Sequence, residues 1–391
     1  MDSVGRPDSR AVEAALSAVD EGGAFRAYRV VEMRTRADAG AVHPAVLAFL
    51  REPGAADTAA ARVVTAACAL GAGWAALDRA LAYARSRIRR GAAPADHHTH
   101  RLIVPHAVRL EAARAALEAT ATRIDAGAAG SPSGAGPDTD GAVAAYLAVE
   151  AGGAAVGAVG AYGGPDPVIP TTWTGGGQAR VLGIARDRLR THAGTAGRFH
   201  RDLAAALGRL PADSGAPTAA LALDCLAVLL DGADSARPEW GELVASAEAA
   251  GWLARRAVAA ADGALPAAAD RGLPPAGCAA LSRIFARRAA LAVAEEALRR
   301  CVARPGRETA RPALLPQPRR SQRAPVGLGE PVGLGEQTRL GEPVGLGERV
   351  GLGERVALVD RARAAQAGLF ADLDAVAAAL HVRAAEAVAA S

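Results

Sequence analysis

The sequence predicts an all-α protein, and three observations carry this prediction. Of its 391 residues, 51% are hydrophobic but only 3% are aromatic. Alanine, leucine and arginine favour helix and dominate the chain, whereas the β-branched and aromatic residues that large sheets need are sparse. Apolar residues also recur at three- and four-residue steps over long segments. We therefore expect an antiparallel four-helix bundle, followed by a second helical region and a disordered repeat.

The clearest helical periodicity covers residues 61–90. Its apolar side chains follow steps of three and four residues, which places them on one stripe of a helix. Asp57 or Thr58 can cap the N-terminus, and Gly91 followed by Pro94 ends the helix. The stripe comprises Val63, Ala67, Leu70, Trp74, Leu77, Leu81 and Ile88.

Three further helices complete the predicted bundle. They run from about residue 96 or 99 to 124, from 142 to 159 and from 177 to 192. The segment 126–140 is rich in Gly, Ser and Pro and is expected to be a loop. Four amphipathic helices of this length pack as an antiparallel bundle.

Shorter helices are expected on both sides of the bundle. Before it, residues 11–19 and 42–50 have helical patterns, but no chemistry can be assigned to residues 1–50. After it, the pattern predicts helices at 203–210, 218–230, 240–261 and 275–302. The terminal segment 356–390 reads as an amphipathic helix or helix pair, with an apolar side formed by Leu358, Leu369, Phe370, Leu373, Val376 and Leu380.

A hexapeptide repeat of the type PVGLGE covers residues 325–360 and follows a Pro- and Arg-rich segment, 304–324. Hexads can coil into a left-handed parallel β-helix, but six of them make only about two coils, fewer than stacking needs. Glycine at two positions of each hexad also makes ordering costly. We therefore favour a flexible linker that arose by tandem duplication. The predicted domains are 1–50, the bundle 51–200, a second helical domain 201–304, the disordered linker and repeat 305–355, and a C-terminal helix 356–391.

Charge and hydropathy exclude two classes of partner. The net charge of +4 is small for this length and forms no concentrated basic stripe, so nucleic-acid binding is not expected. The most apolar run, 219–230, is too short to span a bilayer, and residues 1–40 carry charges throughout, unlike a signal peptide. We expect a cytoplasmic protein that binds neither nucleic acid nor membrane.

Cysteine and histidine spacing gives no metal site. The cysteines, which are expected to be buried thiols in a reducing compartment, are Cys68, Cys225, Cys278 and Cys301. His97, His98 and His100 follow one another too closely on a helix to converge on one ion. No metal is therefore predicted.

Two motifs together carry the functional prediction. The helix 61–90 ends in an arginine cluster, Arg85, Arg87, Arg89 and Arg90. Alone, such a cluster is a solvated helix end that complements the dipole, or a clamp for phosphate. The second motif is the glycine turn 173–178, WTGGGQ, which opens another helix. The pair resembles the C-terminal half of the acyl-CoA dehydrogenase and acyl-CoA oxidase flavoenzymes.

The resemblance implies FAD as the cofactor. In that family an arginine four residues before a glycine contacts the FAD diphosphate, usually of a neighbouring subunit, and Arg87 stands four residues before Gly91. Gly163 and Gly164 resemble the double-glycine turn on the adenine side of the flavin. Trp173 and Gly175, on either side of the position of the catalytic base, are the other cofactor-binding residues that the resemblance implies. The resemblance also implies a homo-oligomer, or a hetero-oligomer with an acyl-CoA dehydrogenase homologue.

The position of the catalytic base departs from the family. In active relatives a glutamate there removes the proton α to the thioester carbonyl while the flavin takes the β hydride. Here that position is Thr174, whose hydroxyl holds its proton too strongly to serve as a base. Some members place the base on the first bundle helix, where this chain has Ala61.

The sequence therefore predicts an acyl-CoA dehydrogenase/oxidase-like protein of fatty-acid metabolism without the N-terminal domain, the β-domain and the catalytic glutamate. Such a protein would be a pseudoenzyme, inactive alone. Two alternatives stay open. One is a non-catalytic helical interaction or scaffold protein, and the other is a subunit of a heteromeric flavoenzyme that a partner completes.

Overall fold

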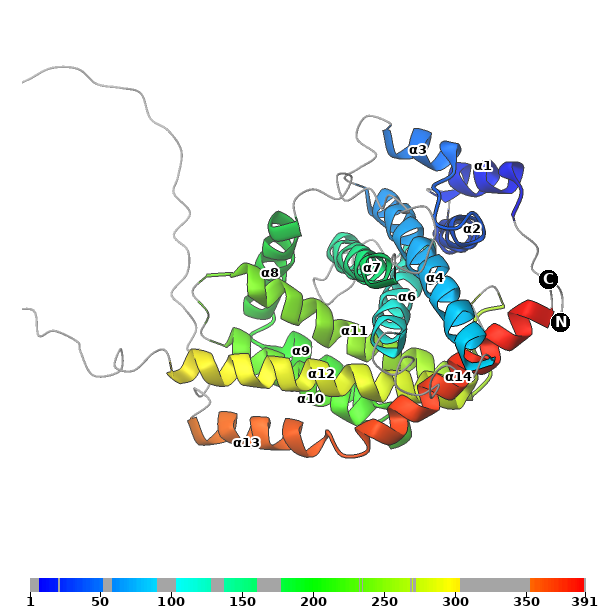
Figure 1. Cartoon of the computed structure of the whole chain (residues 1–391). Coiled ribbons are helices and arrows are strands. Elements are labelled where there is room, and N and C mark those ends of the chain that lie inside the picture. The colour runs from blue at the N-terminus through cyan, green and yellow to red at the C-terminus, as the bar shows by residue number, and fades with distance from the viewer. Residues whose placement is uncertain are drawn as a thin grey trace, which may run out of the picture.

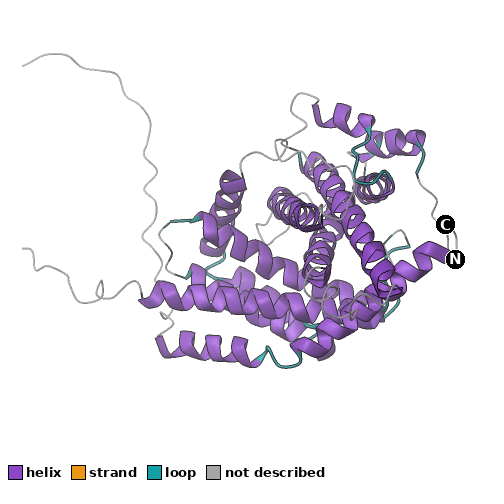
Figure 2. Ribbon diagram, in the orientation of Figure 1, coloured by secondary structure: helices purple, strands orange, loops and turns teal. Residues whose placement is uncertain are grey.

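The protein is all-helical in its described part, as the sequence predicted (Figures 1 and 2). The computed structural model describes residues 7–19, 22–51, 58–89, 103–127, 137–159, 177–231, 233, 235–267, 269, 272–302 and 352–389. Residues 325–351 of the repeat, the histidines at 97–100 and the segment between the helices at 137–159 and 177–194 lie outside these residues. The last residues of the repeat, 352–360, are helical, so the prediction of a disordered segment to residue 355 was wrong for 352–355.

Most helices agree with the predicted segments, but one helix was not predicted. Two bounds also differ: the helix predicted at 203–210 covers 198–207, and residues 137–140, predicted as loop, are helical. The first half of the chain contains α1 (Ser9–Ser17), α2 (Ala24–Ala37), α3 (Pro44–Arg51), α4 (Ala59–Arg89), α6 (Val104–Asp125), α7 (Pro137–Val159) and α8 (Gly177–Gly194). The second half contains α9 (Arg198–Leu207), the 3-10 helix η6 (Ala212–Ser214), α10 (Ala216–Leu230), α11 (Pro238–Ala261), α12 (Pro275–Val302), α13 (Leu352–Ala364) and α14 (Leu369–Ala389).

Helix α4 forms the centre of the first half of the molecule. The backbone N–H of Ala61 donates to the Thr58 hydroxyl at 3.1 Å, so Thr58 caps the helix as predicted. Every described member of the predicted apolar stripe is fully buried. Because alanine fills many of the remaining positions, α2, α6 and α7 can all pack directly against α4.

Helix α2 is the element that the sequence analysis did not predict. It lies across α4 and also contacts α6 (Figure 1). Its inward face carries Glu32 and Thr35 beside Tyr28 and Val31, and all four are buried. Because these two polar residues interrupt the apolar periodicity, the sequence pattern did not indicate a helix here. α2 comes so close to α4 that a Cβ on Gly71 would lie 2.6 Å from the carbonyl oxygen of Glu32.

Helix α8, the fourth predicted bundle helix, packs mainly against α11 and more lightly against α7. The crossing is close because α11 has a glycine there: a Cβ on Gly241 would lie 1.9 Å from the carbonyl oxygen of Val181. α8 therefore joins the predicted bundle to the second helical region.

Two large apolar clusters form most of the core. Each contains residues from both sides of residue 200, where the sequence predicted a domain boundary. The first spans α1 to α7 and extends to Leu281 on α12 and Leu380 on α14. The second spans α8 to α13 and includes Val143 of α7. The domain boundaries proposed from the sequence stay predictions.

The terminal segment forms a helix pair, one of its two predicted forms. Gly368, with a φ of 78°, lies in the turn between α13 and α14. Leu358, Val376 and Leu380 are buried as predicted, but the prediction for Phe370 was wrong because its side chain is 82% exposed. The turn changes the helical phase, so that Leu369 packs inward and its neighbour points outward.

The described cysteines, Cys68, Cys225 and Cys278, are free and buried, as predicted. Burial raises the pKa of Cys68 and of Cys225 to about 12. Two described helical stretches are long and apolar enough to cross a membrane by composition alone, Ala59–Ser86 and Thr139–Ala158. The first stretch is 89% buried inside the protein, as expected of a core helix, and the second is 50% buried.

Candidate functional site

The structure places part of the predicted flavin site. Arg87 lies in the last turn of α4, where the backbone is described but the side chain is not. Ala61, at the alternative base position, lies in the first turns of α4 and is buried. The other predicted residues lie between α7 and α8, outside the described residues: Gly163, Gly164, Trp173, Thr174 and Gly175.

Arg85, two residues before Arg87, is described and makes a long-range contact. Its Nη2 donates a hydrogen bond to the main-chain carbonyl of His381 on α14. Figure 1 shows α14 passing across this end of α4. The arginine end of α4 therefore meets the last helix of the chain.

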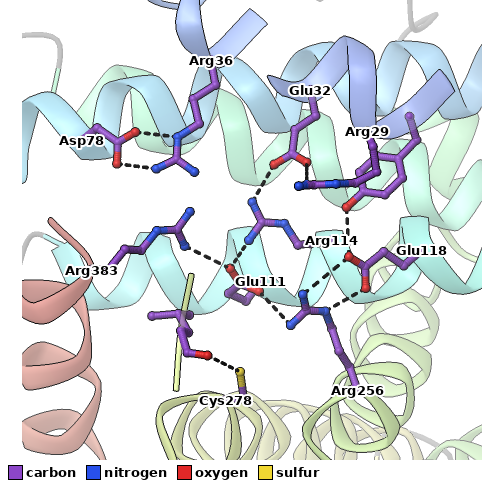
Figure 3. A network of polar contacts seen from close by, with 12 residues as sticks. Arg29, Glu32, Arg36, Asp78, Glu111, Arg114, Glu118, Arg256, Cys278 and Arg383 are labelled. Carbon is purple, nitrogen blue, oxygen red and sulfur yellow. Dashed lines mark hydrogen bonds and ion pairs between the residues drawn. The ribbon is translucent and has the colours of Figure 1, made fainter. Parts of the chain in front are cut away.

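A buried ion network lies next to this end, between α2 and α6 (Figure 3). Arg114 on α6 donates to Glu32 on α2, with an Nη2–Oε1 distance of 2.6 Å. Arg114 also donates to Glu111, one turn earlier on α6. On the other side of Glu32, Arg29 donates to its second oxygen at 2.5 Å. Glu32, Glu111 and Arg114 are each only 1% exposed, so these charges are compensated by one another and not by water.

The network continues from α6 to α11. Arg256 Nε donates to Glu118 Oε2 at 2.8 Å, and Tyr28 on α2 donates its hydroxyl to Glu118 Oε1 at 3.0 Å. Burial alone would lower the pKa of Arg256, but Glu118 and Glu111 raise it far above its usual value. Burial and the neighbouring Glu118 likewise raise the pKa of Tyr28, so the phenol stays protonated and acts as a donor.

Trp74 of α4 forms one wall of the network. Its ring lies beneath three guanidinium groups, with carbon-to-centroid distances of 4.3 Å for Arg383, 4.9 Å for Arg114 and 5.3 Å for Arg36. Cations are attracted to the negative face of an indole ring. Arg383 comes from α14 and also lies 3.8 Å from Glu111, so the network includes the last helix (Figure 3).

A second buried network joins α7, α8, α9 and α11. Arg188 on α8 donates to both oxygens of Glu248 at 2.7 and 2.8 Å, and to Asp140 on α7 at 2.6 Å. Nε2 of His200 lies 3.3 Å from Glu248. Burial alone would raise the pKa of Glu248, but Arg188 and His200 lower it to about 2. Burial lowers the pKa of His200 despite this hydrogen bond.

These carboxylates are arranged for structure and not for proton transfer. A general base needs an acceptor atom within reach of the substrate. Glu32, Glu111, Glu118 and Glu248 are instead buried and ion-paired with arginines. The networks fix the helices relative to one another.

Neither network was predicted from the sequence, although one signal could have revealed the first. Glu111, Arg114 and Glu118 follow steps of three and four residues along α6. They lie immediately beside buried apolar residues of the same helix, Leu110, Ala113 and Leu117. Charges with the spacing of a core stripe indicate a buried network. Among the described residues, no group of three or more His, Cys, Asp or Glu side chains is arranged to hold a metal ion.

Comparison with known families adds an independent finding. Residues 56–203 match the family model of the acyl-CoA dehydrogenase C-terminal domain. The resemblance inferred from the motifs is confirmed for this segment. This acyl-CoA dehydrogenase segment contains α4, α6, α7 and α8 and ends within α9. No curated protein and no solved structure gave a significant match.

Proposed function

We propose that this protein is a flavin-binding member of the acyl-CoA dehydrogenase/oxidase group that does not oxidise acyl-CoA by itself. The matched segment supports the family. The observation that carries the proposal is Thr174 at the position of the family's catalytic glutamate. A hydroxyl cannot take the α proton at neutral pH, so the reaction has no proton acceptor there.

The donor chemistry at the end of α4 fits the diphosphate of FAD. Guanidinium groups bind phosphate in bidentate fashion, and the full charges of Arg85 and Arg87 outweigh the unfavourable dipole at a helix C-terminus. When bound, FAD would supply the hydride acceptor. The residues proposed to hold it are Arg87, Gly163, Gly164, Trp173 and Gly175.

The burial of the carboxylates supports the proposal that the protein does not oxidise acyl-CoA by itself. A different acid could replace the missing glutamate only if it were open to substrate. Glu111 and Glu118 on α6 lie inside the core and are bound to Arg114 and Arg256. Neither is available as a base.

Flavin binding can be tested with purified protein and its Arg87→Ala variant. Loss of one charge-assisted hydrogen bond costs about 1.5–3 kcal/mol, so we expect FAD affinity to fall about 10- to 100-fold. Arg190→Ala is the matched control, because Arg190 is exposed and, among the described residues, forms its ion pair with the exposed Asp187. Equal FAD affinities of the wild type and Arg87→Ala would contradict the proposed role of Arg87.

A partner subunit is the second part of the proposal. The resemblance implies a homo-oligomer or a hetero-oligomer with an acyl-CoA dehydrogenase homologue that could supply the missing base. The open face of α7 supports this, since no heavy atom of the described residues lies within 4 Å of the Cβ positions of Gly153 and Gly157. Light scattering should give a mass above that of one chain, and bulky substitution at Gly157 should lower it. A monomer at every concentration, with no co-purifying flavoprotein, would exclude this part.

We place the protein in the cytoplasm, in a reducing compartment. The buried, unbridged thiols of Cys68, Cys225 and Cys278 support this assignment. Cell fractionation of the native host tests it.

A further inference from the structure

The terminal helices α13 and α14 are fastened to α12 by two arginines. Arg283 Nε donates to Asp372 Oδ1 at 3.0 Å, and Arg287 binds the same carboxylate. Arg287 also donates to the carbonyls of Ala365 and Ala367, both at 2.7 Å. These carbonyls follow the end of α13, where the helix dipole is negative, and Asp372 lies in the first turn of α14. The turn between the two helices is therefore held by polar contacts, in which Arg287 and Asp372 are both buried.

The apolar seam beneath the pair is narrow. Leu358 and Val359 of α13 and Val376 and Leu380 of α14 are buried, whereas Phe370 and Val382 are exposed. Alanines fill much of the rest of the seam. Small side chains bury little apolar area, so the pair is held less firmly than a core helix such as α4.

The covalent connection to the pair is far longer than its position requires. Arg355 Nη1 donates to the carbonyl of Ala297 at 2.9 Å, so the start of α13 lies beside the end of α12. Between Val302 and Leu352 there are 352 − 302 − 1 = 49 residues. At full extension a chain of this length spans on the order of 160 Å. The pair can therefore leave α12 without straining the chain.

The far end of α14 lies on the arginine end of α4. Arg85 of α4 donates to the carbonyl of His381, while Arg383 lies over Trp74 and beside Glu111 of α6. Figure 3 shows Arg383 entering the ion network from α14. In this arrangement α14 engages Arg85 and lies across the turn that contains Arg87.

We propose that α14 is a releasable cap on the arginine end of α4, which competes with a diphosphate-containing nucleotide for Arg85. This inference rests on the proposed flavin binding. The docked helix occupies Arg85 with a peptide carbonyl, and release returns that guanidinium to the ligand. A ligand that binds only the released state has an affinity reduced by the fraction of molecules in which α14 is docked.

The test uses the full chain with Val376→Glu and Leu380→Glu together. These changes place charges in the apolar seam under α14 and leave Arg85 and Arg87 untouched. Phe370→Glu and Val382→Glu together are the matched control, because they add the same two charges to exposed positions of the same helix. Hydrogen exchange of α14 reports release, and titration with FAD reports affinity. We expect faster exchange and at least tenfold tighter FAD binding in the double variant, and neither change in the control.

Each other outcome decides a different claim. Faster exchange with unchanged FAD affinity would overturn the cap but not the proposed flavin binding. Faster exchange with weaker FAD binding would also overturn the cap and would show that α14 is part of the flavin site. No FAD binding by any form would overturn both the cap and the proposed flavin function. If α14 stays protected in the double variant, Asp372→Ala is added; protection in the triple variant would show that α14 is not releasable.

Discussion

At the scale of single residues, buried arginine is the feature that organises this protein. Arg114, Arg188 and Arg256 lie in the interior and connect helices that are distant in sequence. Replacing a whole buried ion pair by apolar residues is often neutral, whereas removing one partner leaves an uncompensated charge. The networks are therefore best tested by changing one member at a time.

Arg114→Met should be strongly destabilising. It leaves Glu32 and Glu111 buried without their shared partner, which we expect to cost about 3–5 kcal/mol of unfolding free energy in urea titrations. Arg190→Met, on the surface, should change stability by less than about 0.5 kcal/mol. A loss below about 1 kcal/mol in Arg114→Met would show that the network does not hold α2 on α6.

The second network predicts a loss of stability in mild acid. Burial lowers the pKa of His200, so the folded state keeps it neutral while the unfolded state takes up a proton as the pH falls below about 6.5. The unfolding free energy should therefore fall between pH 7 and 5, and His200→Gln should reduce this slope. His43→Gln, outside the network, is the control. A further fall is expected below about pH 4.5, the usual pKa of a glutamate, because the pKa of Glu248 is held at about 2 in the folded state. An identical slope in the wild type and His200→Gln would contradict this account.

The arginine cluster at the end of α4 could be predicted from the sequence, but the long-range contacts of its arginines and of the nearby buried charges could not. Arg85 and Arg87 belong to an arginine cluster that is evident in the sequence. The contact of Arg85 with His381 joins residues 296 positions apart, and no local pattern encodes such a pairing. For the same reason Glu32 could not be matched with Arg114 in advance.

At the scale of elements, periodicity determined what could be predicted. Helix α4 was predictable because its inward stripe is apolar throughout, and α12 starts and ends where the pattern does. Helix α2 was not, because its inward face includes a charged residue whose partner lies on α6. Helix crossings at glycine are equally invisible in one sequence, since a glycine that permits contact resembles one in open space.

The two kinds of helical glycine give opposite predictions. Gly241→Ala would place a methyl group 1.9 Å from the carbonyl oxygen of Val181, so α8 and α11 must separate. We expect a loss of about 2–3 kcal/mol. Gly153→Ala on α7, where no described heavy atom lies within 4 Å of the Cβ position, should instead raise stability by about 0.5–1 kcal/mol, because alanine favours helix. Thermal unfolding of both variants checks this; a stable Gly241→Ala protein would contradict the close crossing.

At the scale of the whole molecule, the acyl-CoA dehydrogenase segment does not stand alone. Its helix α8 packs on α11, and its α6 is ion-paired with Arg256 of the same helix. Both apolar clusters extend beyond the matched residues. We therefore expect the segment 56–203, expressed by itself, to lack a cooperative unfolding transition. A sharp transition for that fragment would show that the later helices are dispensable for folding.

We proposed above that Thr174 leaves the protein without a proton acceptor for acyl-CoA oxidation. The most direct measurement is anaerobic bleaching of the flavin absorbance when a panel of saturated acyl-CoA thioesters is added to the purified, FAD-loaded full chain. We expect the flavin to stay oxidised with every thioester, although FAD is bound. Reduction of the flavin by any of them would contradict this proposal.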